Sequence, residues 1–136
     1  MATFVKLGGG NTDDITKVIT LAVRVNAANN YMTLESPVGV DYTVPGGKTL
    51  YITKAILTSD SIGAGFVVGY GDTGVGNGAA APTSAIQLTE EWRNSFATHG
   101  SSDFSMVAVI PTGKLPYIRQ GIVAGDVRIT CFGLLL

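Results

Sequence analysis

Apolar and polar residues alternate with a period of two along several short stretches of this chain. In residues 16–25, apolar Ile19, Leu21 and Val23 alternate with positions that include Thr20 and Arg24. This is the pattern of a strand with one buried face. Residues 49–58, 64–70 and 127–135 show comparable stretches, and shorter ones occupy residues 31–35, 84–88, 104–110 and 115–118.

These stretches predict an all-β fold, an antiparallel two-sheet sandwich of jelly-roll type. Residues 104–110 are apolar on both faces and predict a central strand. Residues 115–118 contain Pro116, which favours a sheet edge because proline has no N–H to donate. We expect a single β-sandwich domain over residues 15–136. Residues 1–14, which include three consecutive glycines, predict an N-terminal arm.

One short helix is predicted near residues 89–97. Thr89 is a suitable N-cap, and Glu90-Glu91 would place two acids in the first turn, where they favour the helix dipole. Trp92 and Phe96 are four residues apart and would pack on one helix face.

Charged residues are scarce. They make up 14% of the chain, against about 25% in a typical globular domain, while 46% of the residues are hydrophobic. A free monomer usually surrounds itself with charge, so we expect part of this surface to be covered in a homo-oligomer or a larger assembly. The net charge is −1 and the nine basic residues are scattered, which argues against nucleic-acid binding.

The sequence predicts neither a membrane segment nor a signal peptide. No apolar stretch approaches the roughly 20 residues that cross a bilayer. The first residues lack a basic segment followed by an apolar core. The expectation is a protein made in a cytoplasm and kept there or released by lysis.

No motif indicates catalysis or a bound cofactor. The G-x-G-x-x-G pattern of residues 69–74 is followed by Val75-Gly76-Asn77-Gly78, which argues against the helix that a dinucleotide site needs and for a surface loop. His99, Ser101, Ser102 and Asp103 carry the side chains of a hydrolytic triad without a nucleophile elbow. We therefore predict a protein that is not an enzyme and has no cofactor.

Metal binding is not expected either. One histidine and one cysteine cannot form a structural zinc site, and no calcium-binding loop motif occurs. The aspartates of predicted turns are expected to cap backbone amides instead. Cys131 lies in an apolar strand pattern and is expected to be a small buried core residue.

Residues 44–53 (Val-Pro-Gly-Gly-Lys-Thr-Leu-Tyr-Ile-Thr) and 122–129 (Ile-Val-Ala-Gly-Asp-Val-Arg-Ile) are similar to turn-and-strand segments of small viral jelly-roll domains. The chain resembles the decoration, or cement, proteins of tailed-bacteriophage capsids. This resemblance implies a virion protein, made in the host cytoplasm, that clamps neighbouring subunits of the major capsid protein as a homo-oligomer, a dimer or trimer. It implies no catalytic residues.

Such proteins often use terminal arms, which makes two apolar groups candidate contacts with a partner. The candidates are Phe4, Val5 and Leu7 near one end and Leu134, Leu135 and Leu136 at the other. The three leucines also fit a final strand buried in the domain's own core. The alternative function is a fibre-head or carbohydrate-binding or receptor-binding β-sandwich module, in which aromatic residues would stack on a ligand.

Overall fold

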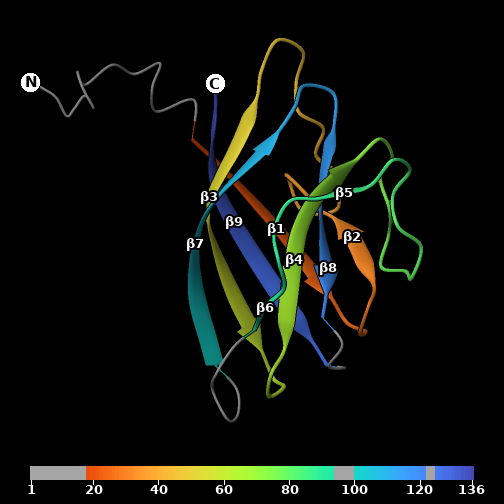
Figure 1. Ribbon diagram of the computed structural model, residues 1–136, viewed down its shortest axis with the longest axis vertical. Coiled ribbons are helices and arrows are strands. Elements are labelled where there is room, and N and C mark those ends of the chain that lie inside the picture. The colour runs from red at the N-terminus through yellow and green to blue at the C-terminus, as the bar shows by residue number, and fades with distance from the viewer. Residues whose placement is uncertain (1–17, 94–99, 122–124) are drawn as a thin grey trace, which may run out of the picture.

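The computed structural model describes residues 18–93, 100–121 and 125–136 of the 136-residue chain. This part of the chain forms nine strands and no helix (Figure 1). The strands are β1 (Val18–Val25), β2 (Tyr31–Thr33), β3 (Leu50–Ser59), β4 (Gly65–Gly71), β5 (Ile86–Gln87), β6 (Trp92–Arg93), β7 (Gly100–Ile110), β8 (Leu115–Gln120) and β9 (Val127–Leu135).

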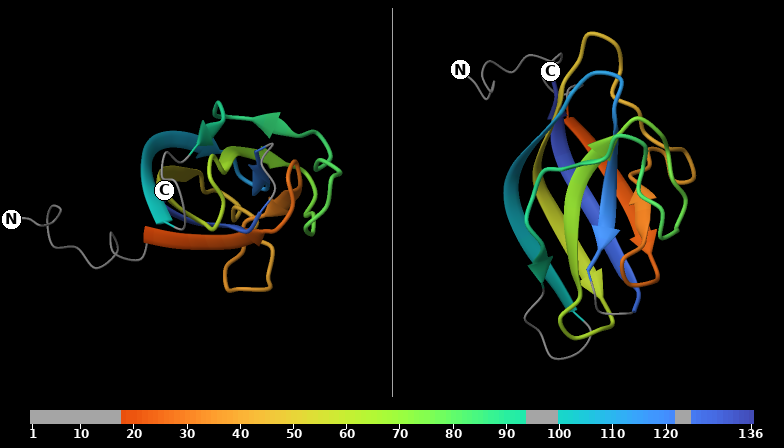
Figure 2. Two further views of the ribbon diagram at one scale, coloured as in Figure 1. Left: turned by 90° about the horizontal axis from the view of Figure 1, so that it is seen from below. Right: turned by 45° about the vertical axis from the view of Figure 1, so that its right-hand side comes forward.

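The strands form two antiparallel sheets that face each other across the core (Figure 2). A four-stranded sheet has the order β1-β9-β3-β7, and a five-stranded sheet has the order β2-β8-β4-β5, with β6 also on β4. The first strand therefore pairs with the last, the second with the second-last and the third with the third-last. This is the arrangement of a long hairpin rolled into a jelly roll, and it confirms the predicted fold class.

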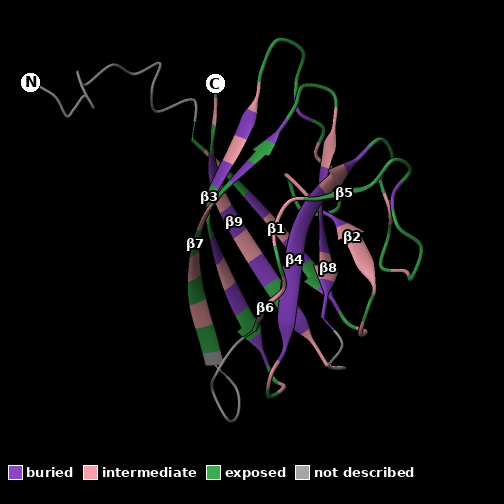
Figure 3. Ribbon diagram, in the orientation of Figure 1, coloured by how far each residue is buried: buried purple, intermediate pink, exposed green. Residues whose placement is uncertain are grey.

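The core lies between the inner faces of the two sheets. Burial alternates along β1 and β9, so that buried and accessible residues follow each other along these strands (Figure 3). Phe66 of β4 contacts the rings of Trp92 and Phe104 edge-on, with centroids 5.5 and 5.2 Å away. Trp92 and Phe104 stack at 5.7 Å. This aromatic cluster joins β4 and β6 of one sheet to β7 of the other.

The prediction of a helix near residues 89–97 is wrong for residues 89–93, which are the part of this range that the structure describes. Trp92–Arg93 pair with β4 as strand β6, and residues 89–91 are not helical. The Thr89 hydroxyl accepts a hydrogen bond from the Val68 N–H, 3.0 Å away, instead of capping a helix. Burial of the Trp92 ring against β4 and β7 outweighs the local capping signal. Phe96 lies outside the described residues.

Two strand positions also differ from expectation. β7 was expected in the centre of a sheet but lies at an edge, and β8 was expected at an edge but lies between β2 and β4. Pro116 lies beside Leu34 and has no N–H to donate to the Leu34 carbonyl. The Tyr42 N–H donates to that carbonyl instead, so β8 tolerates the proline. The Pro116 carbonyl in turn accepts from the Leu34 N–H.

Residues 45–48 form a tight turn, as the similarity of residues 44–53 to turn-and-strand segments implies. The Lys48 N–H donates to the Pro45 carbonyl at 3.2 Å, and Gly47 has a φ of 75°, which favours glycine. The predicted arm, residues 1–14, lies outside the described residues, so the boundary at residue 15 stays a prediction.

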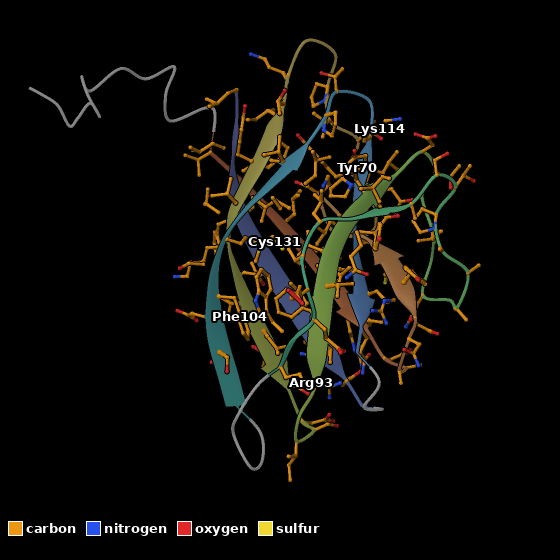
Figure 4. The ribbon with its side chains drawn as sticks, in the orientation of Figure 1. Tyr70, Arg93, Phe104, Lys114 and Cys131 are labelled. Atoms are coloured by element: carbon orange, nitrogen blue, oxygen red, sulfur yellow. The ribbon has the colours of Figure 1, made fainter. Side chains whose placement is uncertain are left out.

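Cys131 is buried in β9, as expected, and burial raises the pKa of its thiol to about 12 (Figure 4). The thiolate is the reactive form of cysteine, so the folded protein holds this side chain in an unreactive state.

β3 carries an irregularity against both of its neighbours. Its register shifts between Ile52 and Lys54 against β7 and against β9. At this point Gly133 of β9 passes close to β3, and a Cβ atom there would lie 2.5 Å from the Tyr51 carbonyl oxygen. The central pair of the four-stranded sheet therefore depends on a residue without a side chain at position 133.

We expect Gly133→Ala to lower the free energy of unfolding by about 1–3 kcal/mol, because the new methyl group would force two backbones apart. Urea denaturation followed by tryptophan fluorescence measures this change. Gly76→Ala is the matched control, because a Cβ atom there would meet nothing within 4 Å. Equal stability of the two variants would contradict the role given to Gly133.

We expect the native Cys131 thiol to resist a thiol reagent such as DTNB at mildly alkaline pH and to react rapidly in guanidinium chloride. The unfolded thiol ionises near its ordinary pKa, so raising the pH from about 8.5 towards 12 should favour the unfolded state and lower stability. Rapid labelling of the folded protein would contradict the burial of this group.

Candidate functional site

The described residues contain no centre for metal-dependent or triad chemistry. They include no group of three or more His, Cys, Asp or Glu side chains that would hold a metal ion. Ser101 and Asp103 lie exposed on β7, and the Asp103 carboxylate is 3.5 Å from the Lys54 ammonium group. His99 lies outside the described residues. The described residues also contain no helix that could cross a membrane.

The glycines of the G-x-G-x-x-G pattern allow close packing. A Cβ atom at Gly69 would lie 2.4 Å from the Tyr117 ring, and one at Gly71 would lie 2.4 Å from Pro82. No helix follows Gly74; residues 72–75 are irregular. Gly69 and Gly71 therefore have a packing role, which the sequence analysis did not predict, and the expectation that no helix follows the pattern is confirmed.

The segment after β4 covers the edge of β2. The Tyr31 N–H donates to the Gly78 carbonyl at 2.7 Å, and the Gly78 N–H donates back to Tyr31 at 3.2 Å. The Val75 carbonyl accepts from the Thr33 N–H at 3.1 Å. This glycine-rich segment was expected to be a surface loop without periodicity, and its backbone continues the sheet.

The acidic side chains of the turns hold other parts of the same chain. Asp126 accepts from the Arg24 guanidinium, and its N–H donates to the Asp60 carboxylate at 3.1 Å. Lys114, labelled in Figure 4, donates a hydrogen bond to the Asp72 carboxylate, and this bond lowers the pKa of Asp72. The stability that this exposed pair contributes is present at neutral pH and is lost as the pH falls through the lowered pKa.

One pocket of about 440 Å³ lies beside β1 and β9. Its charged lining residues are Arg24, Glu35 and Arg128. Arg24 binds Asp126, and Glu35 accepts a hydrogen bond from the Gly39 N–H at 2.8 Å. The charges at this pocket thus stabilise the fold, and the geometry offers no set of positioned groups for a reaction.

The outer face of the four-stranded sheet carries a continuous row of apolar side chains, which we call the outer row. Strand register places Val18 opposite Leu134, Leu134 opposite Tyr51, and Tyr51 opposite Val109. Directly opposite residues of antiparallel strands have their side chains on the same face, about 5 Å apart. The outer row therefore crosses all four strands, over a width of about 14 Å.

The outer row is accessible to a partner. Val18 is 57% exposed, Val109 is 41% exposed and Leu134 is 39% exposed, while Tyr51 is half-buried between its neighbours. Val107, two residues before Val109 on β7, is 76% exposed and extends the apolar surface along the edge strand. Contiguous exposed apolar groups on a sheet are a feature of protein interfaces.

The opposite end of the same face is charged. Arg24 of β1 pairs in register with Arg128 of β9, and Arg128 pairs with Thr58 of β3. Both arginines are exposed and lie near Asp126. The face thus has an apolar half and a charged half, which resembles the core and rim of an interface.

The structure divides the candidate contact residues of the C-terminal end. Leu134 belongs to the outer row, Leu135 packs against the core, and Leu136 is exposed and pairs through its backbone with Thr49. The structure thus places one of the three leucines against the core and leaves two exposed. Whether they contact a partner stays a prediction. Phe4, Val5 and Leu7 lie outside the described residues.

Sequence reasoning missed Val18, Tyr51, Val107 and Val109 as surface candidates. Val18 and Tyr51 belong to stretches that are far apart in the sequence. Val107 and Val109 belong to β7, which was expected to be buried on both faces. The available signal was an apolar residue at a position where alternation calls for a polar one, as at Tyr51 between the buried Leu50 and Ile52.

A scan against protein-family models finds no match, and a search of curated proteins finds none either. Among solved structures, the chain is similar to a chain of the giant freshwater prawn Macrobrachium rosenbergii extra small virus VLP. The identity is 12%, the TM-score is 0.33, and the match covers 87% of this chain and 77% of that one.

Two structures of infectious bursal disease virus also match. The Gx strain matches at 13% identity and a TM-score of 0.31 over 85% of this chain, and the Gt strain at 12% and 0.33 over 84%. The matches cover only 33% and 32% of those viral chains. Likeness this distant assigns no function to this chain.

Proposed function

We propose that this chain is a structural protein of a viral capsid that decorates the shell and clamps neighbouring subunits of the major capsid protein. The observation that carries the proposal is the outer row, an exposed apolar surface built across four strands of a rigid sheet. Burying such a surface contributes about 25 cal/mol per Å² of apolar area. Repeated around a shell, modest contacts add up through avidity.

The scarcity of charge supports the same function. Charged residues are 14% of the chain, and several of those described form ion pairs within it, such as Lys114 with Asp72 and Arg93 with Glu91. A protein that works through covered surfaces needs little exposed charge. The proposed role is non-enzymatic, on the virion surface after synthesis in the host cytoplasm, and it involves neither nucleic acid nor membrane.

The alternative, a fibre-head or glycan-binding module, has less support. Sugar recognition by stacking needs an accessible aromatic face, but the aromatic side chains in the described part of the chain are buried or half-buried. Trp92 stacks on Phe104, and Tyr31 meets the buried Tyr117 edge-on at 5.5 Å. Specific binding of the purified protein on a glycan array would favour this alternative over the capsid role.

We expect the double variant Val18→Ser/Leu134→Ser to bind capsids about tenfold or more weakly than the wild type, because it removes two apolar groups from the outer row. Shells assembled from the major capsid protein alone are mixed with each protein and pelleted through sucrose. The bound fraction gives the occupancy.

The matched control is Ile62→Ser/Ile86→Ser, which removes two exposed apolar side chains outside the outer row. It should bind as the wild type does. Equal occupancy for both double variants would refute the outer row as the contact. Circular dichroism establishes that each variant is folded.

The resemblance to decoration proteins generates a second test. Deleting residues 1–11 should leave a folded domain that binds capsids poorly, because the arm would supply Phe4, Val5 and Leu7 as anchors. Thermal unfolding and the pelleting assay separate folding from binding. Full occupancy by the shortened protein would remove the arm from the proposal and leave the outer row as the contact.

A further inference from the structure

The sheets of this protein have edges that the chain covers in different ways. An uncovered edge presents unpaired N–H and C=O groups to any other strand. The segment around Gly78 and Val75 covers β2, as described above. At β1, Ala22 and Glu35 exchange two backbone hydrogen bonds of 3.2 Å. The strands β5 and β6 have two residues each, too short to recruit a partner.

β7 has no such contact on its free edge within the described residues. It is an edge strand of eleven residues, the longest in the fold (Figure 1). Within the described ranges 18–93, 100–121 and 125–136, its backbone hydrogen bonds go to β3 alone. β7 also lacks lysine, arginine and proline, the residues that commonly protect an edge.

The backbone direction at Val109 follows from the neighbouring strands. Thr49 and Leu136 exchange two hydrogen bonds, so the Thr49 peptide groups face β9. Peptide groups alternate along a strand, so those of Leu50 face β7 and those of Tyr51 face β9 again. Val109, opposite Tyr51, therefore directs its N–H and C=O away from β3 and towards the open edge.

The side chains of β7 indicate that its partner is an uncharged, apolar strand. Its single charge, Asp103, already lies 3.5 Å from Lys54 of the same chain. The half of the strand near Val107 and Val109 is apolar and exposed. We propose that β7 pairs with β7 of a second copy of this chain, antiparallel about a two-fold axis near Val107, so that two four-stranded sheets become one continuous sheet.

This register places Val107 opposite its own copy and Val109 opposite Ser105 of that copy. An axis nearer to Asp103 would set two aspartates opposite each other, which costs stability. The register at Val107 keeps them apart and buries the most exposed valine of the edge. The two Val107 side chains then lie side by side at the axis, between the two outer rows. The inference does not depend on the capsid role, since it concerns the chain alone.

The test is the mass of the full chain in solution, measured by light scattering after gel filtration. The wild type should have twice the monomer mass of 14.1 kDa. Val107→Lys should be a monomer, because two ammonium groups would meet at the axis. Val38→Lys is the matched control, since it places the same charge on an exposed valine away from β7, and it should stay a dimer.

A charge exchange tests the register itself. Val107→Glu alone should also be monomeric, but an equimolar mixture of Val107→Lys and Val107→Glu should recover the dimer, because opposite charges then face each other. A monomeric or trimeric wild type would overturn the proposal, as would a Val107→Lys dimer or a mixture that stays monomeric. Val18→Ser/Leu134→Ser should remain a dimer, which separates this interface from the capsid contact.

Discussion

The pairing of the first described strand with the last is the constraint on which this fold depends. β1 and β9 align over eight residues, from Val18 opposite Leu134 to Val25 opposite Val127. β9 also pairs with β3 on its other side, so the end of the chain forms the middle of a sheet. The remaining strands then pair in order from the outside inwards. Loop closure over more than a hundred residues is unfavourable. Burial of Leu21, Val23 and Ile129 between the sheets offsets that cost.

The same constraint decides where functional surfaces lie. A rolled hairpin brings residues from distant parts of the sequence into rows across a sheet, and the outer row is one such row. It also leaves edges, which the chain covers at β2 with the segment after β4 and at β1 by a single bridge from Glu35 to Ala22. Among the described residues, two accessible surfaces are the outer face of the four-stranded sheet and the edge at β7. The proposed capsid contact rests on the first of these surfaces, and the proposed pairing of two copies rests on the second.

Much of the fold was predictable because the alternation of apolar and polar residues indicates which face of each single strand is buried. Eight of the nine strands, the turn at Gly46-Gly47 and the burial of Cys131 all follow from local patterns. Position within a sheet depends on pairing, which local patterns do not encode; β7 and β8 were therefore misplaced. The helix start at Thr89 failed because Trp92 gains more by packing on Phe104 than by helix formation. Single positions of the outer row, such as Tyr51 and Leu134, carried a sequence signal, but the row itself was not predictable because only strand pairing brings its four residues together.

The polarity of the outer face has a further consequence for how a partner would dock. The apolar half can exclude water, whereas Arg24 and Arg128 at the other half keep their charges solvated and held near Asp126. Buried apolar contacts supply affinity, and rim charges influence the rate and the orientation of approach. Lys54 and Asp103 pair on this face between the two halves and mark the boundary. A partner that covers the outer row is thereby directed to one end of the sheet.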